Sequence, residues 1–347
     1  NMKALSTLLI VPFEFNEDSM YIPGNDIYPD LNFYNQLSTT VNCNTEYYVE
    51  NSFQKLISDA SIDQNQCISL FHMNIRSTRA NLDKTIAYLN SLRYHFNFLG
   101  FSESMLKEHV DELYNIPGYN QLGLSRTTNI YQKGGGVSLY IDEKYSFKVR
   151  DDLSIGNDIW TCLFVEVELH KKVLVGVIYR PPGSNLPEFT EAFGGIIGLI
   201  KSNNTPCYIM GDTNVDLLKY SNHKATREFL DVMYSNGFVP LINRPTRIQE
   251  GKATCIDHIY TNDLSVNNTA LQGILVTDIT DHFPLFYVSQ FQSKLVNSNQ
   301  DENFLTRKLT QSNLAKFKSL TSQTDWSCVT DENGNPIFRA DERITKI

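Results

Sequence analysis

CISLFHMN, residues 67–74, is a short and mostly apolar run that ends on an asparagine. A run of this length is too short for a typical helix and indicates a buried strand over 67–73. The run PCYIMGD at 206–212 repeats the arrangement, with a strand over 206–211 that ends on Asp212. Packing does not explain polar residues placed directly after buried strands, and function in α/β folds concentrates at such strand ends.

Helices and further strands mix on both sides of these two runs. Apolar residues at helical spacing predict helices over 81–93, 187–200 and 224–235. Short apolar runs predict strands over 96–101, 135–141, 159–169, 173–179, 256–261, 273–277 and 283–288. Because no helix separates 159–169 from 173–179, these two strands are expected to pair antiparallel. The sequence therefore predicts an α/β sandwich of mixed sheets with helices outside, rather than a doubly wound parallel sheet.

The charge of the chain divides it into three parts. Residues 1–65 carry two basic and nine acidic side chains, 66–291 carry 20 and 23, and 292–347 carry eight and seven. We expect 1–65 to be an acidic, mostly irregular segment with a short helix near 52–58, because its periodicity is weak. Residues 66–291 are expected to form the domain. A nearly neutral domain is not typical of a nonspecific DNA binder, unless several of its acids are committed to a metal.

Composition excludes two classes of site. The longest apolar runs fall well short of the ~20 residues that span a bilayer, so no membrane partner is expected. The six cysteines lie far apart, with no CxxC and no Cys/His ligand spacing. They are therefore interpreted as reduced thiols that mostly pack in the core, and not as a zinc site or a disulfide framework.

Polar residues stand at the ends of six predicted strands. They are Asn74, Glu103, Tyr179 with Arg180, Asp212 with Asn214, Asp257, and Asp281 with His282. Four carboxylates that converge on one cleft would repel one another, which a raised pKa or a bound cation relieves. Carboxylate and amide oxygens without cysteine favour Mg²⁺ or Mn²⁺. Taken singly, each residue could also be a turn, a cap or a packing residue, and His258 is expected to point outward from its strand and to be structural.

Taken together and in order, these residues belong to eight blocks that resemble the endonuclease/exonuclease/phosphatase family. The blocks are MNIRS at 73–77, SES at 102–104, GGGVSLYI at 134–141, YRPP at 179–182, GDTN at 211–214, PTR at 245–247, IDH at 256–258 and TDHFP at 280–284. The NIRS, YRPP and PTR blocks look most like the apurinic-type endonuclease domain of non-LTR (LINE-like) retrotransposons. The resemblance spans about residues 67–290. It implies a DNase I-like fold: a four-layer α/β sandwich of two mixed β-sheets packed face to face, with helices outside.

The resemblance also implies a reaction. It predicts a DNA endonuclease dependent on Mg²⁺, for which Mn²⁺ can substitute, that nicks phosphodiester bonds and leaves a 5′-phosphate and a 3′-hydroxyl. Asn74 and Glu103 would hold the cation, and Asp281 would lie in or near its shell. Arg247 and Arg180 would lie against DNA. No small-molecule cofactor is implied, and the family alone implies a nuclear location.

The catalytic roles that the resemblance implies fall on five residues. Asp212 would deprotonate the attacking water, with Asn214 holding it in place. Asp257 would orient His282, which would contact a phosphate oxygen. Tyr179 would hydrogen-bond the scissile phosphate or orient its neighbours.

The chain also departs from the family's pattern. Arg76 stands where repair-type relatives carry an acid or an amide, which would thin the metal shell, and Thr213 replaces an aromatic residue. Residues 292–347 resemble a polar linker and a connector toward a reverse transcriptase, whose Phe/Tyr-x-Asp-Asp motif is absent here. This pattern predicts an element copy truncated before the polymerase, which would contact element RNA only through that missing domain. Two alternatives remain: a catalytically silent fragment that acts at most as a binding module, and a phosphatase of the same superfamily.

Overall fold

The buried strands form where the sequence is apolar without alternation. The computed structural model describes residues 45–106, 114–126, 135–220, 222–249, 251–263, 270–291 and Ser319. All eight residues of β2 (Cys67–Asn74) and all six of β10 (Cys207–Asp212) are buried. A strand shows this pattern when both faces of its sheet are covered, so the side chains of both faces lie in a core.

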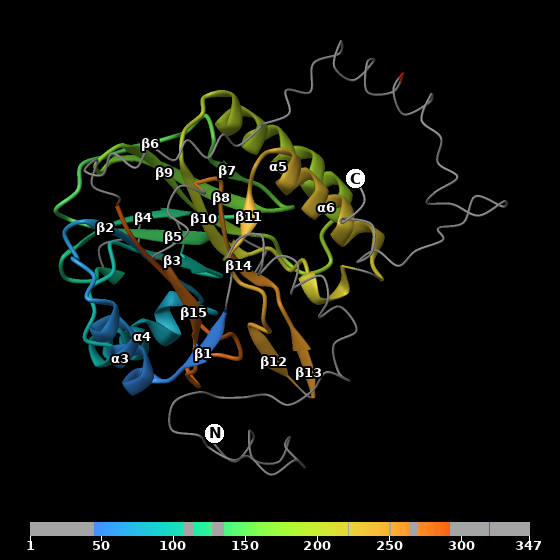
Figure 1. Ribbon diagram of the computed structural model, residues 1–347. Coiled ribbons are helices and arrows are strands. Elements are labelled where there is room, and N and C mark those ends of the chain that lie inside the picture. The colour runs from blue at the N-terminus through green and yellow to red at the C-terminus, as the bar shows by residue number, and fades with distance from the viewer. Residues whose placement is uncertain are drawn as a thin grey trace. The chain divides into compact units, whose positions relative to one another are not determined.

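The described strands form two large mixed sheets and one small hairpin (Figure 1). The first sheet has the order β1 (Glu46–Tyr48), β15 (Leu271–Leu275), β16 (Leu285–Gln290), β2, β3 (Phe98–Ser102), β5 (Val137–Asp142) and β4 (Tyr119–Leu124). The second has the order β11 (Val239–Pro240), β14 (Asp257–Thr261), β10, β9 (Lys172–Tyr179), β8 (Thr161–Glu168) and β6 (Phe147–Val149), with β7 (Ile155–Gly156) paired to β8. The hairpin joins β12 (Arg247–Gln249) to β13 (Lys252–Thr254). As predicted, β8 and β9 pair antiparallel.

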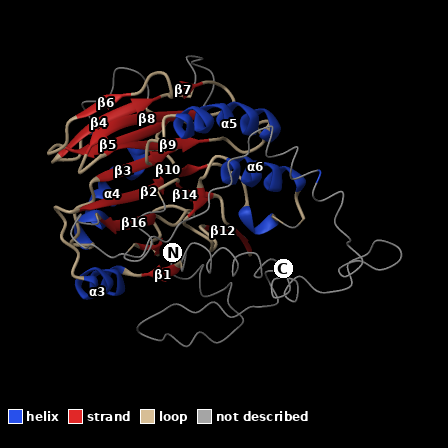
Figure 2. Ribbon diagram, turned by 45° about the horizontal axis from the view of Figure 1, so that its top comes forward, coloured by secondary structure: helices blue, strands red, loops and turns tan. Residues whose placement is uncertain are grey.

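Helices cover the outer face of each sheet, so the described fold has four layers (Figure 2). Helices α3 (Glu50–Ala60) and α4 (Thr78–Ser91) pack on the first sheet through one apolar cluster. Helices α5 (Leu186–Ser202) and α6 (Lys224–Ser235) lie on the second sheet, and the short 3-10 helix η2 (Leu217–Lys219) follows β10. This arrangement confirms the predicted α/β sandwich. No helix within the described residues is long and apolar enough to span a bilayer.

The expected start of the domain at residue 66 is wrong. Strand β1 pairs with β15 in parallel, and Phe53 on α3 is fully buried against the first sheet. The short helix expected near 52–58 lies within α3, but its packing on the sheet was missed because β1 has only three residues and so carries no sequence signal. The remaining expectations for residues 1–44 and 292–347 lie outside the described residues, Ser319 apart.

Strand direction brings the predicted site residues to one edge of the sandwich. The pairs β2/β3 and β9/β10 are parallel, so Asn74 is level with Ser102, and Tyr179 is level with Asp212. Strand β14 runs antiparallel to β10, so its first residue, Asp257, lies opposite Asp212. Parallel strands end at the same edge of a sheet, and an antiparallel neighbour begins there. The sequence therefore places polar tips from both sheets at a common edge.

Candidate active site

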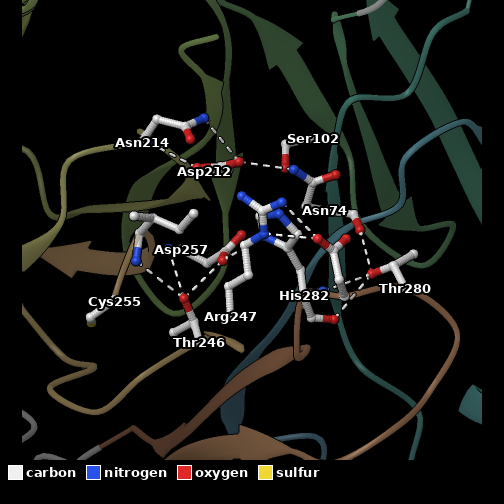
Figure 3. Close-up of polar contacts among 12 residues, drawn as sticks. Asn74, Ser102, Asp212, Asn214, Thr246, Arg247, Cys255, Asp257, Thr280 and His282 are labelled. Atoms are coloured by element: carbon white, nitrogen blue, oxygen red, sulfur yellow. Dashed lines mark hydrogen bonds and ion pairs between the residues drawn. The ribbon is translucent and has the colours of Figure 1, made fainter. Parts of the chain in front are cut away.

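Asn74 links the two sheets at this edge (Figure 3). Its side-chain amide Nδ2 donates to Glu103 Oε1 at 3.0 Å and to Asp212 Oδ2 at 2.8 Å. Its Oδ1 accepts from the backbone N–H of Arg76 at 3.1 Å, which fixes the orientation of the amide. Since Glu103 and Asp212 share one donor nitrogen, their bonded oxygens are no farther apart than the sum of these two bonds.

Asp212 is buried and held by Asn214 as well as by Asn74. The backbone N–H of Asn214 donates to Asp212 Oδ1 at 2.8 Å, and its side-chain Nδ2 reaches Oδ2 at 3.2 Å. The tight turn that allows both bonds puts Asn214 at φ 49°, a left-handed conformation that asparagine tolerates well. Asp212 and Asn214, predicted to act together, are therefore in direct contact.

A second buried pair, Asp257 and His282, lies beside Asp212. His282 Nδ1 donates to Asp257 Oδ2 at 2.8 Å, and both side chains are at most 4% exposed. Sequence reasoning missed Thr246, whose hydroxyl donates to the same oxygen at 2.8 Å and accepts from the backbone N–H of Asp257 at 3.1 Å. One ligand-type atom from each of Asp212, Asp257 and His282 lies within 4.8 Å of the others.

Burial and mutual charge set the protonation of these three groups. Burial, and then the charge of Asp257, raise the pKa of Asp212 to about 7, although His282 and the hydrogen bonds oppose this. Burial disfavours the His282 imidazolium, but Asp257, Asp212 and Asp281 more than offset it and raise its pKa to about 9. Burial would raise the pKa of Asp257, yet facing His282 keeps it below its usual range. The arrangement thus pairs a cationic imidazole with a nearby carboxyl group that can exchange a proton at neutral pH.

Tyr179 and Glu103 complete the same edge. The Tyr179 hydroxyl donates to Glu103 Oε1 at 3.2 Å, and burial followed by the charge of Glu103 raises the pKa of Tyr179 far above its usual value. Tyr179 is therefore protonated, and its single O–H proton is donated to Glu103. Glu103 itself adopts φ 51° directly after β3. Backbone strain of this kind is frequent at functional sites.

Two expectations, those for Arg180 and His258, are corrected by the contacts. Arg180, expected against DNA, is only 4% exposed and donates to the carbonyls of Thr213, Ser184 and Asn214, so it holds the loop after β10. Asp281, expected in or near a metal shell, accepts from Arg76 and Arg247. His258 does not point outward: it is fully buried and its Nε2 bonds the carbonyl of Val215 at 3.1 Å, because β14 is covered on both faces.

The donor set fits a hard divalent cation at Glu103 and Asn74. Glu103 is half-buried and its Oε1 already accepts from Asn74 and Tyr179, which orients the carboxylate for a cation at its other oxygen. The atoms that could ligate a cation are this carboxylate oxygen and Asn74 Oδ1, because Asn74 Nδ2 donates to Glu103 and Asp212 and cannot ligate; oxygen ligands are the type that Mg²⁺ and Mn²⁺ prefer. The Asp212, Asp257 and His282 group fits less well, since the raised pKa of His282, about 9, keeps the imidazole cationic at neutral pH, and a cationic ring does not ligate a metal.

The two mixed sheets packed as a sandwich, with helices outside, match the DNase I-like fold. The chain belongs to the endonuclease/exonuclease/phosphatase family, whose sequence profile matches residues 42–282. Divalent metals are typical of this superfamily.

Two solved structures support the fold. One is an AP endonuclease, LMAP, from Leishmania major, which is 11% identical with a TM-score of 0.53, covering 84% of this chain and 99% of its own. The other is the endonuclease domain of TRAS1, a telomere-specific non-LTR retrotransposon, which is 12% identical with a TM-score of 0.50, covering 65% of this chain and 100% of its own. At such low identity the similarity establishes the fold alone. No curated protein sequence matches this chain significantly.

Proposed function

We propose that this protein is a divalent-metal-dependent DNA endonuclease that nicks one strand and leaves a 5′-phosphate and a 3′-hydroxyl. The observation that carries the proposal is the buried Asp212, held by two asparagines beside the Asp257–His282 pair. The retrotransposon-like blocks of the sequence support target-site cleavage as the setting, in which the 3′-hydroxyl would prime reverse transcription. Action on chromosomal DNA would place the protein in a nucleus.

In the proposed reaction, Asp212 removes the proton of the attacking water. Its raised pKa, about 7, suits a general base that works near neutral pH. Asn74 and Asn214 fix the carboxylate, so that the water it binds has one direction of approach. Oxygen Oδ2 of Asp212 accepts from both side-chain amides and Oδ1 accepts from the backbone N–H of Asn214, which leaves one lone pair, on Oδ1, for the water.

His282 would neutralise charge on the phosphate. Its Nδ1 is bonded to Asp257, so the opposite ring nitrogen, Nε2, is the one that can donate to a phosphate oxygen. Tyr179 would orient the Glu103 carboxylate through the hydrogen bond that it donates. A divalent cation at Glu103 and Asn74 would supply Lewis-acid stabilisation of the developing negative charge. These charge contacts are required because a single general base contributes only about 10²–10⁴-fold.

The test is nicking of supercoiled plasmid by the purified full chain, with Mg²⁺ or with EDTA. We expect relaxed circles only with the metal, and a loss of about 10²-fold or more in Asp212→Asn and His282→Asn. Asp231→Asn removes an exposed carboxylate on the outer helix α6 and is the matched control that should keep full activity. Nicks that DNA ligase reseals and a polymerase extends would establish both end groups.

Other outcomes separate the alternatives. Hydrolysis of a phosphomonoester, with plasmid left intact, would indicate a phosphatase of the same family. A folded wild-type protein that cuts neither substrate with Mg²⁺ or Mn²⁺ would contradict enzymatic function and leave a binding role.

A further inference from the structure

Arg76 is fixed at the rim of the site by an unusual turn. It follows β2 at φ 48°, and Ser77 after it adopts φ 106°. The backbone N–H of Arg76 donates to Asn74 Oδ1, and that of Ser77 donates to the carbonyl of Glu103 at 2.8 Å. Non-glycine residues in this region cost of order 1–3 kcal/mol each and persist where surrounding contacts over-determine them. Contacts with Asn74 and Glu103, both in the proposed site, therefore fix the backbone from which the Arg76 side chain extends.

Arg247 reaches the same place from the other side. It begins β12 and forms an isolated antiparallel bridge with His282, and the backbone N–H of Phe283 donates to the carbonyl of Thr246 at 2.7 Å. The backbone of Arg247 is thus tied to His282, just as the backbone of Arg76 is tied to Asn74. The backbone of each arginine is therefore anchored to a residue of the proposed site, Asn74 for Arg76 and His282 for Arg247.

Asp281 holds the two guanidinium groups together. Its Oδ1 accepts from Arg76 Nη1 at 2.6 Å, and its Oδ2 accepts from Arg247 Nε at 2.8 Å and Nη2 at 2.7 Å. Two cations would otherwise repel at this separation, so one carboxylate between them stabilises the pair. The trio carries a net charge of +1 and stays accessible, with the Arg76 side chain 48% exposed and that of Arg247 26%.

Fold stability does not explain this trio. Ion pairs at such exposure contribute about 0–1 kcal/mol, and Arg76 makes no other side-chain hydrogen bond among the described residues. A guanidinium carries five N–H donors in a planar fork that matches a phosphate. Arg247 also donates from Nη2 to Gln249 Oε1, and each arginine keeps donors that neither Asp281 nor Gln249 uses. The two guanidinium groups, held in place by Asp281, thus form a preorganised anion-binding site next to His282.

We propose that Arg76 and Arg247, bridged by Asp281, bind a backbone phosphate of the DNA beside the one that is cut, and that Asp281 is a positioning residue and not a metal ligand. The inference rests on the proposed function and deepens it. Arg76, which stands where a metal-shell acid or amide is expected, would in this proposal bind the substrate instead.

The experiment measures DNA binding and metal binding separately, on the full chain. DNA affinity is read by fluorescence anisotropy of a labelled duplex in EDTA, where no cutting is expected, over a range of salt. Metal affinity is read by electron paramagnetic resonance of Mn²⁺ without DNA. The variants are Arg76→Gln, Arg247→Gln and Asp281→Asn. Circular dichroism melts check that each variant is folded.

Two controls match these changes. Arg93→Gln removes an exposed arginine that lies beyond the far end of α4, whose 14 residues separate it from Arg76 by about 20 Å. Asp278→Asn removes an exposed carboxylate three residues before Asp281. Both controls should leave DNA affinity within about twofold of the wild type.

We expect Arg76→Gln and Arg247→Gln each to weaken DNA binding about tenfold and to lower the salt slope by about one. Asp281→Asn decides the proposal, because removing an acid near DNA ordinarily tightens binding. Here binding should weaken, while Mn²⁺ affinity stays within about twofold.

Tighter DNA binding by Asp281→Asn, or a loss of Mn²⁺ affinity of about tenfold or more, as the loss of a ligand would give, overturns the proposal. Unchanged binding in both arginine variants, with a wild type that binds and nicks DNA, overturns this inference alone. A wild type that neither binds nor nicks DNA overturns the proposed function as well.

Discussion

Asn74 couples two carboxylates that would otherwise repel each other. Its single amide nitrogen donates to both Glu103 and Asp212, so one neutral side chain lowers the cost of placing two anions at the junction of the sheets. An aspartate at position 74 could not make these contacts, since an ionised carboxylate has no donor. The residue at the end of β2 is therefore set by hydrogen-bond chemistry and not by charge alone.

Two buried histidines outside the proposed reaction give a prediction about pH. Burial lowers the pKa of His72 and of His258 to about 4. A histidine pKa below the unfolded value of about 6.5 means that the unfolded chain binds a proton that the folded chain does not. Each group therefore contributes stability above pH 6.5 that is lost as the pH falls toward 4.

His258→Gln tests this, because position 258 contacts Val215 and Tyr260 and lies outside the reacting group. We expect the variant to be less stable than wild type at pH 7.5 in urea unfolding. At pH 5 its deficit should shrink by about 2 kcal/mol, because the wild type alone loses the contribution of this histidine. A deficit that stays constant between the two pH values would contradict a depressed pKa.

Strand-end residues could be predicted from sequence, while their pairings could not. Asn74 and Asp212 each follow an apolar run, and that signal is local. The hydrogen bond between Arg180 and Thr213 and the ion pair between Arg76 and Asp281 join residues 33 or more positions apart in the sequence. Alternation misplaced His258 because it assumes one solvated face, and β14 has none.

At the scale of elements, apolar core strands were predictable and polar edge strands were not. The predicted helix over 224–235 has the same bounds as α6, because one face of this helix carries apolar residues at helical spacing. Edge strand β4 reads YNQLGL and is only partly buried, so it lacks a periodic signal. The short strands β11, β12 and β13 were missed because two or three residues carry no period.

Gly211 is required where β10 meets β9, and this gives the second prediction. A Cβ at position 211 would lie 2.0 Å from the backbone oxygen of Ile178, an atom that cannot move without disturbing the sheet. We expect Gly211→Ala to lower the free energy of unfolding by about 3 kcal/mol. It should also reduce nicking per folded molecule, because Asp212 is the next residue.

Gly195→Ala is the matched control for this change. No atom lies within 4 Å of a Cβ built at Gly195 on α5, where alanine is the better helix former. We expect it to be neutral or stabilising by up to about 1 kcal/mol. Equal effects at the two glycines, measured by urea unfolding, would show that close approach of β9 to β10 is not the reason for Gly211.

At the scale of the whole molecule, the site depends on two sheets that pack face to face and bring their strand ends to a common edge. Asn74 and Glu103 come from the first sheet, and Tyr179, Asp212 and Asp257 come from the second. Met210 of β10 packs where Gly100 of β3 has no side chain, which shows how closely the inner faces approach. Any loss of sheet packing therefore separates the proposed metal ligands from the proposed base.

The segment before residue 66 belongs to this packing, which leads to the last prediction. Phe53 on α3 is fully buried; it stacks on Phe96 and meets Tyr94 and Phe286 edge to face on the outer side of the first sheet. We expect Phe53→Ala to lower the free energy of unfolding by about 3–5 kcal/mol, because the rigid cluster around it cannot collapse into the space left behind. Phe53→Leu keeps most of the volume and should cost clearly less. Below the unfolding transition both variants should nick DNA as the wild type does, because α3 covers the face of the sheet that is turned away from the second sheet. A Phe53→Ala protein that unfolds like the wild type would contradict a stabilising role for the packing of α3 against the first sheet.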